Sequence, residues 1–221
     1  MKHLPFRPVK RLAAALLVFA LVLSGVSLGA RGDPKKKIAP ADQARARAML
    51  IRQADMGLAF TSSPAGRNNA DFYCAALDES DLTLTGEAES PSFTSTVEFV
   101  SSRAYVYRTR ADADASWRRG TSARGQKCLR DGLRGELRGT SVRLVSFRKL
   151  PFPKLARRSV LYRVVADQQG VRIYLDLVAL QHSRAQVAIV YGSGLSPPPA
   201  AEERRLAKVT AARMAKAMGG S

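Results

Sequence analysis

The stretch SVLYRVVADQQGVRIYLDLVALQHSRAQVAIVY, residues 159–191, contains three apolar runs separated by two short polar segments, DQQG and QHSR. The runs are rich in Val, Leu, Ile and Tyr, which favour strands. The polar segments are short enough to be tight hairpin turns, and strands joined by such turns are antiparallel. The stretch therefore predicts an antiparallel sheet with strands at 159–166, 171–180 and 185–191.

Alternation of apolar and polar residues predicts further half-buried strands earlier in the chain. We expect them at 82–88, 93–100, 104–109 and 141–147. The SSR segment at 101–103 is either a bulge within one continuous strand or a turn between two strands.

Helical patterns lie before, between and after the strands. We expect helices at 40–57, 111–119, 122–137 and 201–218. Asp42 is placed to cap the first helix. The order α, β, α, β, α predicts one α+β domain over residues 42–218, in which helices pack on the flanks of an antiparallel sheet.

The composition is that of a basic globular protein. Lys and Arg number 36 against 18 Asp and Glu, so the formal net charge is +18, and 46% of the residues are hydrophobic. This apolar content excludes a disordered chain, and the charge favours anionic partners.

The N-terminus predicts export. A basic segment, MKHLPFRPVKR, precedes the apolar run LAAALLVFALVL at 12–23, and small residues follow. This is the three-part pattern of a secretory signal over residues 1–30, and Gly25-Val26-Ser27 suits cleavage. The alternative is an uncleaved membrane anchor. Either way the N-terminus engages the membrane, residues 31–41 form a basic linker, and the domain is extracytoplasmic, secreted or anchored to the outer face of the cytoplasmic membrane.

Two cysteines remain in the exported part, Cys74 and Cys128, which permits one disulfide. Its loop of about 55 residues corresponds to roughly 4 kcal/mol of stabilisation. A reactive thiolate would need an activating His, and the one exported His, His182, lies in the QHSR turn. Two Cys and one His make no recognisable ligand spacing, so we expect neither a metal nor a cofactor.

Catalytic motifs are also missing from the exported sequence. The exported part contains no G-x-S-x-G, H-E-x-x-H or phosphate loop, so we expect a non-catalytic domain, with a cell-envelope hydrolase or transferase of unrecognised site as the alternative. Asp78, Glu79 and Asp81 in ALDESD lack the alternate spacing of a calcium loop and are interpreted as a turn. Asp176 in YLDLV is expected on the solvent face, opposite its leucine neighbours, rather than buried beside a ligand.

A basic segment with interleaved aromatic residues surrounds Trp117. Its candidate anion-binding residues are Arg108, Arg110, Arg118 and Arg119. In the cytoplasm such a segment would suggest nucleic acid. Outside the membrane we expect an anionic lipid or cell-wall polymer as partner, and no nucleic acid. The alternative is a charged, solvated surface without a ligand, with Trp117 in the core.

Several segments taken together resemble a known group of proteins. They are the opening helix, the region around Cys74, DLTLTGEAES, FVSSRAYVYRTRADADASW, CLRDGL, SVLYRVV and AEERRLAKVTAARMA. They resemble uncharacterised secreted or lipid-anchored actinobacterial proteins, which are similar to the extracellular sensor domains of mycobacterial receptor serine/threonine kinases and more distantly to PsbP-like sandwiches.

The resemblance covers residues 40–218. It implies a single sheet flanked by helices, a disulfide in the exported domain, and a sensing or solute-binding role. The chain differs from the sensor kinases in having no kinase domain, and from the lipid-anchored members in having no cysteine for lipidation.

Overall fold

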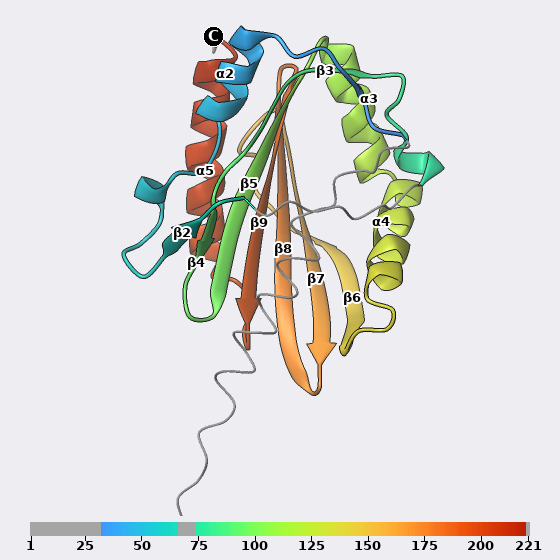
Figure 1. Ribbon diagram of the computed structural model, residues 1–221, viewed down its shortest axis with the longest axis vertical. Coiled ribbons are helices and arrows are strands. Elements are labelled where there is room, and N and C mark those ends of the chain that lie inside the picture. The colour runs from blue at the N-terminus through green and yellow to red at the C-terminus, as the bar shows by residue number, and fades with distance from the viewer. Residues whose placement is uncertain (1–31, 66–73, 220–221) are drawn as a thin grey trace, which may run out of the picture.

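The computed structural model describes residues 32–65 and 74–219, and it confirms an α+β fold with one sheet and helices on both of its faces (Figure 1). The strands are β1 (Lys35–Lys36), β2 (Thr61–Ser63), β3 (Thr83–Glu89), β4 (Ser92–Thr94), β5 (Glu98–Tyr107), β6 (Val142–Leu150), β7 (Arg158–Gln168), β8 (Val171–His182) and β9 (Ala185–Gly194). The helices are α2 (Pro40–Ala48), α3 (Arg110–Thr121), α4 (Ala123–Glu136) and α5 (Ala200–Ala217), with short 3-10 turns η1 (Gln53–Asp55) and η2 (Ala75–Leu77).

The sheet has the order β1-β3-β5-β9-β8-β7-β6, and β4 joins β2 to β5 at one side. Its pairs are antiparallel except for β1 with β3. The stretch at 159–191 forms β7, β8 and β9, as predicted. Both of its turns are tight: Gln169 and Gly170 in the first, and Ser183 in the second, take the positive φ that short hairpin turns use.

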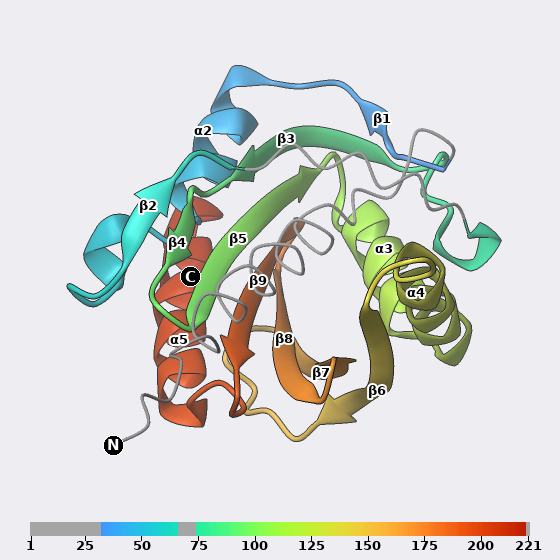
Figure 2. The ribbon, with the colours of Figure 1, turned by 60° about the horizontal axis from the view of Figure 1, so that its bottom comes forward.

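The two faces of the sheet carry different helices. The sheet curves, with α2 and α5 on the outside of the curve and α3 and α4 on the inside (Figure 2). Met49 of the α2 end and Leu206 of α5 belong to the largest apolar core, on the outer face. On the inner face, Leu133 and Leu137 join one smaller core and Ala113 of α3 joins another. The inner face of the sheet therefore has space between two separate helix contacts.

The predicted disulfide between Cys74 and Cys128 is present, with Cα atoms 6.2 Å apart, within the range that disulfides span. It ties the residue before η2 to the middle of α4. Cys74 is thus a structural residue, as the sequence indicated.

The first helix is shorter than predicted, because α2 ends at Ala48 instead of continuing to 57. The cap assigned to Asp42 is also wrong: the helix begins at Pro40, and its N-cap is Ala39. Asp42 is instead buried, and it binds Arg184 from the β8–β9 turn through two contacts of 2.7 Å. Thr85 of β3 donates a third hydrogen bond of 2.6 Å to the same carboxylate.

Two local uncertainties of the sequence are resolved. The SSR segment lies within β5, which pairs continuously with β9, so it is neither a turn nor a bulge against that strand. The helices after it are separated at Ser122, whose side chain accepts a hydrogen bond of 2.9 Å from the Gly125 amide and so caps α4.

The N-terminal segment differs from a solvated linker. Lys35 and Lys36 form β1 at the edge of the sheet, and the amides of Lys35, Lys37 and Ala39 donate to carbonyls of the β3 segment over 2.8–2.9 Å. The folded unit therefore includes the described part of 31–41. The predicted signal or anchor at 1–30 lies outside the described residues. Within residues 32–65 and 74–219, no helix has the length and apolar character needed to cross a bilayer.

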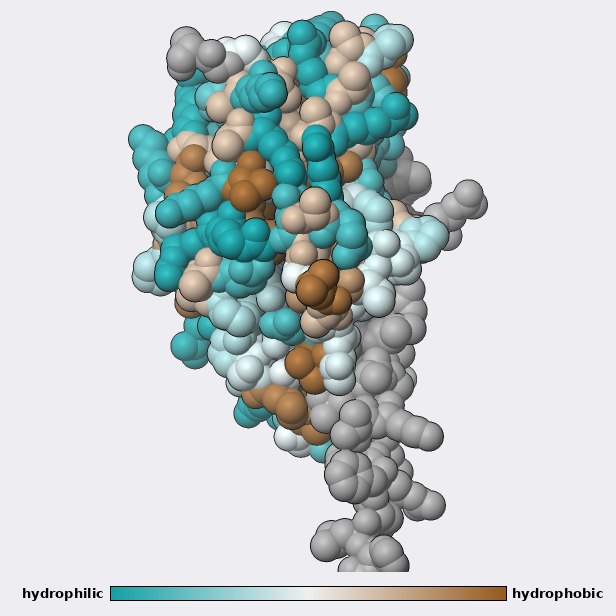
Figure 3. Space-filling model, turned by 90° about the vertical axis from the view of Figure 1, so that its left-hand side faces the viewer, coloured by the Kyte–Doolittle hydropathy of each residue, from teal (hydrophilic) through white to brown (hydrophobic). Residues whose placement is uncertain are grey.

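The outer surface over α5, α2 and β2 is mainly hydrophilic (Figure 3). Its apolar residues stand as separate spots. Leu58, between η1 and β2, is the most exposed large hydrophobic residue described. Single exposed apolar residues are normal on a soluble domain. This face therefore offers no continuous apolar surface, and the candidate site lies on the inner face of the sheet.

Candidate ligand-binding groove

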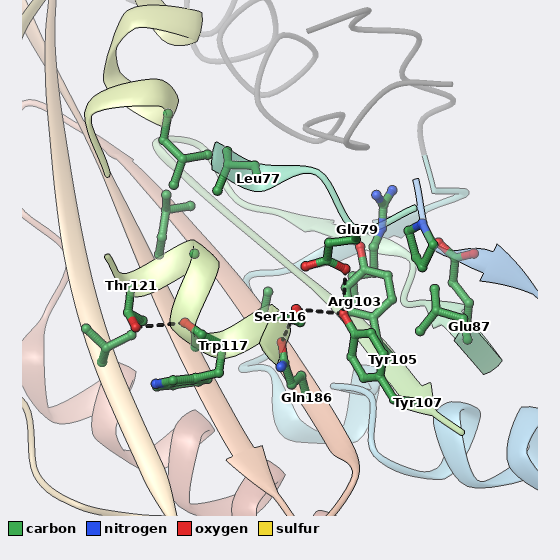
Figure 4. A pocket seen from close by; sticks show the side chains of 18 of the residues that line it. Leu77, Glu79, Glu87, Arg103, Tyr105, Tyr107, Ser116, Trp117, Thr121 and Gln186 are labelled. Carbon is green, nitrogen blue, oxygen red and sulfur yellow. Dashed lines mark hydrogen bonds between the residues drawn. The ribbon is translucent and has the colours of Figure 1, made fainter. Parts of the chain in front are cut away.

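A pocket of about 290 Å³ lies between the inner face of the sheet and helix α3 (Figure 4). Tyr105, Leu177 and Ala188, from β5, β8 and β9, contribute to its floor. Trp117 of α3 and Leu129 of α4 contribute to its wall. The lining is largely apolar with a few polar groups, which is the usual character of a small-molecule site.

The pocket is open because small residues face one another across it. Ala179 and Ala188 lie on the sheet, and Gly120 lies on the facing side of α3. None of these small residues can fill the space between the two helix contacts. Where α4 packs on the sheet, by contrast, Leu133 and Leu137 fill the space between helix and sheet. Interiors are normally close-packed, so a row of small side chains here maintains a real opening.

A second pocket of about 200 Å³ continues from the first. The two share Arg103, Tyr105, Leu129, Leu177 and Ala188. We call the two pockets together the groove. Their combined space, extended along the sheet, suits an elongated ligand better than a compact one.

One end of the groove carries a chain of hydrogen-bonded side chains (Figure 4). The Tyr107 hydroxyl lies 3.0 Å from Glu79 Oε2 and 2.8 Å from Ser116 Oγ. Ser116 Oγ lies 3.5 Å from Gln186 Oε1, and Gln186 Nε2 donates to the Ala113 carbonyl over 2.7 Å. Burial raises the pKa of Glu79, although the hydroxyls of Ser116 and Tyr107 oppose the shift.

The two basic residues of the groove are paired. Arg103 binds Glu89 over 2.7 Å, and Lys36 of β1 binds Glu87 over 2.7 Å. Burial also raises the pKa of the Tyr105 phenol to about 12, so its hydroxyl stays protonated at neutral pH. Tyr105 can therefore serve as a neutral hydrogen-bonding group on the groove floor.

The groove is acidic in a strongly basic protein. Its lining contains the acids Asp33, Glu79, Glu87 and Glu89 and the bases Lys36 and Arg103. The formal charge of the whole chain is +18. The groove therefore does not share the affinity for anions that the composition indicates.

The four arginines predicted to bind anions do not form one site. Arg108, Arg110 and Arg118 are exposed on or beside α3. Arg119 instead binds Asp81 through two contacts of 2.6 and 2.7 Å, and this pairing raises the pKa of Arg119. Trp117 was expected either within the basic anion-binding segment or in the core, and in the structure it lines the groove.

Sequence reasoning missed Glu79, which the turn interpretation of ALDESD left on the surface. The residue is 5% exposed and lies next to Tyr107, which is 28 positions away in the chain. No local pattern marks it, because its burial depends on the pairing of β3 with β5 and on the packing of α3. Figure 4 shows its carboxyl between Leu77 and Tyr107, facing the groove.

The expectation for Asp176 is wrong, because that residue is fully buried. Helix α5 covers this face of β8, so the side opposite the leucines is a core face and not a solvent face. Arg163 binds both oxygens of Asp176, one of them over 2.7 Å. Glu203 of α5 lies nearby, and burial together with the Asp176 charge raises the pKa of Glu203. This cluster fastens α5 to the sheet and has no connection with the groove lining.

The remaining chemistry of the described residues adds no second site. In the two described ranges, no group of three or more His, Cys, Asp or Glu side chains is placed to hold a metal ion. Neither a protein-family model nor a curated protein sequence matches this chain. The function must therefore be inferred from the groove itself.

Proposed function

We propose that this protein is a non-catalytic binding domain that holds a small ligand with an apolar body in the groove. The observation that carries the proposal is the opening of about 290 Å³, extended by about 200 Å³, on an otherwise packed sheet. Pockets of a few hundred Å³ with apolar walls and few polar groups are typical ligand sites. The sensor-like resemblance of the sequence supports the same class of function.

The non-catalytic part of the proposal rests on how the polar groups of the groove are used. Ser116 is one of the buried hydroxyl groups of the groove, and the side chains of Tyr107 and Gln186 are its hydrogen-bond partners. Neither partner is a base that would activate a serine at neutral pH. A cell-envelope hydrolase or transferase remains the alternative, and turnover of an ester or glycoside substrate that is lost on Ser116→Ala would support it.

We also propose an extracytoplasmic location. The signal-like segment at 1–30 and the disulfide between Cys74 and Cys128 support it, since disulfides persist outside the cytoplasm. Protease treatment of intact cells tests the location. Complete protection of the domain, with digestion only after lysis of the cytoplasmic membrane, would contradict it.

Filling the groove should abolish binding of an apolar probe. We expect N-phenyl-1-naphthylamine, a neutral fluorescent probe, to bind the wild-type protein with one saturating site. Ala188→Trp should weaken this binding by at least about tenfold, or about 1.4 kcal/mol, because the indole would occupy space shared by both pockets.

The matched control is Ala44→Trp, which adds the same side chain at an exposed position of α2. It should bind the probe as the wild type does. Unchanged binding by Ala188→Trp, with a cooperative melting transition like that of the control, would show that the probe does not enter the groove.

A second candidate function, binding of an anionic surface, rests on the exposure of Arg110 and Arg118 on α3. Arg110→Glu combined with Arg118→Glu should weaken binding to phosphatidylglycerol vesicles at least about thirtyfold at low salt, since each basic residue near an anionic surface contributes about 1 kcal/mol. The control is Arg204→Glu with Lys208→Glu, which changes the net charge equally on exposed positions of α5. Equal losses in a vesicle sedimentation assay would mean that only net charge matters.

A further inference from the structure

The hydrogen bonds at the polar end of the groove determine which ligand head it can accept, on the assumption that the proposed binding function is correct. Glu79, Tyr107, Ser116 and Gln186 form one connected chain there. Ser116 and Tyr107 have one hydroxyl proton each, and the direction of each hydrogen bond can be assigned by following these protons from Gln186.

The chain is oriented from its Gln186 end. Gln186 Nε2 donates to the Ala113 carbonyl, so Gln186 presents Oε1, an acceptor, to Ser116. Ser116 satisfies this acceptor only by donating its hydroxyl proton to it. Ser116 Oγ must then accept from Tyr107, which lies 2.8 Å away.

Tyr107 has a single hydroxyl proton, and this arrangement uses it on Ser116. In this orientation the contact of 3.0 Å between the Tyr107 oxygen and Glu79 Oε2 is a hydrogen bond only when Glu79 carries the proton. The surroundings agree with this assignment, because none of the described residues forms an ion pair with Glu79. A buried carboxyl without a cationic partner favours its neutral form.

The neighbouring charges do not overturn the assignment. From α3, Arg119 faces this end, but Asp81 from the segment before β3 binds it through both of its terminal nitrogens. From β5, Tyr105 and Tyr107 face Glu79 as neutral phenols, since burial raises the pKa of both. Elsewhere in the lining, Lys36 and Arg103 are bound by acids, and Asp33 adds a further acid.

We propose that the groove binds an uncharged amphiphile, with its apolar body along the sheet floor and a hydroxyl head that donates to the second carboxyl oxygen of Glu79. In the described part of the chain that oxygen, Oε1, accepts no hydrogen bond. A neutral carboxyl presents it as an acceptor to the groove. An anionic head would find Lys36 and Arg103 already bound by acids, and a cationic head would require Glu79 to lose the proton on which the chain depends.

Three probes with the same chain and different heads test the proposal: 1-decanol, decanoate and decylamine. Each competes with N-phenyl-1-naphthylamine for the wild-type protein at about pH 7, where decanoate and decylamine are charged. We expect decanol to displace the probe at a concentration about tenfold below that of either charged compound. Preference for decylamine would mean an ionised Glu79, and preference for decanoate would mean that Arg103 governs the site, so either result overturns the proposal.

Two variants separate the head contact from the shape of the groove. Glu79→Gln keeps a neutral carbonyl at this position and should keep decanol affinity within about threefold, whereas Glu79→Leu should weaken it about tenfold, the value of one good hydrogen bond. Both should keep a cooperative melting transition like that of the wild type, which shows that the groove is still folded. Unchanged decanol affinity in Glu79→Leu would overturn the proposal.

The pH dependence provides a further readout. Wild-type decanol affinity should fall as the pH rises through the raised pKa of Glu79, whereas Glu79→Gln should show no such fall. A flat wild-type profile up to about pH 10, where unperturbed carboxyls are long ionised, would count against a titrating Glu79 contact. Failure of N-phenyl-1-naphthylamine itself to bind the wild type would instead refute the proposed binding function, and this inference with it.

Discussion

Replacement of Cys74 or Cys128 by alanine should lower the melting temperature by about 10 °C, and by similar amounts for the two residues. The disulfide closes a loop with a sequence separation of 54, which corresponds to about 4 kcal/mol in the chain-entropy description. For a domain of this size, each kcal/mol shifts the melting temperature by about 2–4 °C. The loss is a large part of the roughly 5–15 kcal/mol that holds a domain folded.

The double variant should be little less stable than either single variant, because the same bond is lost in all three. Reduction of the wild type should lower its melting temperature comparably, and intact-mass measurement should show a gain of two hydrogens. Additive losses in the single variants, or two free thiols in the purified oxidised protein, would contradict a structural disulfide.

Asp42→Asn should destabilise the domain by about 3–5 kcal/mol, the usual cost of removing one partner of a buried ion pair. The asparagine leaves Arg184 without the carboxylate that binds it through two contacts of 2.7 Å. Arg184 also donates to the Tyr107 carbonyl over 2.8 Å, so the change disturbs β5 as well as α2. Denaturant unfolding followed by circular dichroism measures the loss.

Asp131→Asn is the matched control. Asp131 also pairs with basic residues, Lys127 and Arg134, but on the exposed surface of α4. Exposed pairs contribute little to stability, so this variant should unfold with the wild type. If Asp42→Asn behaved in the same way, the Asp42–Arg184 pair would not be a determinant of stability.

The Asp42 pair should also make stability depend on acid. Hydrogen bonds from Arg184, Thr85 and Arg45 lower the pKa of Asp42 well below its ordinary value, against the effect of burial. The stabilisation is therefore complete above the unfolded-state pKa of about 3.9 and is lost as pH falls through the lower folded-state pKa. The difference in unfolding free energy between wild type and Asp42→Asn should accordingly shrink below about pH 4, and a difference that stays constant in acid would contradict this account.

The parts of the fold predicted from the sequence are those that depend on local chemistry. The DQQG and QHSR segments formed the expected tight turns, and α5 covers Ala200–Ala217 where 201–218 was expected. The α2 helix shows the limit of this reasoning. Its continuation to 57 is interrupted where Met49, Leu50 and Ile51 turn into the core, a tertiary effect that the helical period does not reveal.

The site was not predicted because its features come from residues that meet only in the folded chain. The arginines of α3 were chosen as candidates because they are numerous, yet Asp81 binds Arg119. The groove lies on the other side of the helix, where Trp117 lines it. Glu79 was interpreted as part of a turn, and Asp176 was interpreted as solvent-facing because α5 was not known to cover β8. Small residues such as Ala188 carry no local signal at all, although they keep the groove open.

The edge strand β1 gives the domain a mechanical property. The chain enters the described structure at Gly32, whose carbonyl accepts a hydrogen bond of 2.6 Å from the Glu79 amide, and then runs along β3 through Lys35 and Lys36. A force that pulls on the chain before Gly32 is therefore transmitted first to the backbone of Glu79, and next to β1, whose Lys36 lines the groove. Tension at this end therefore reaches two residues that line the groove, Glu79 and Lys36, before it reaches the main core beneath α2 and α5.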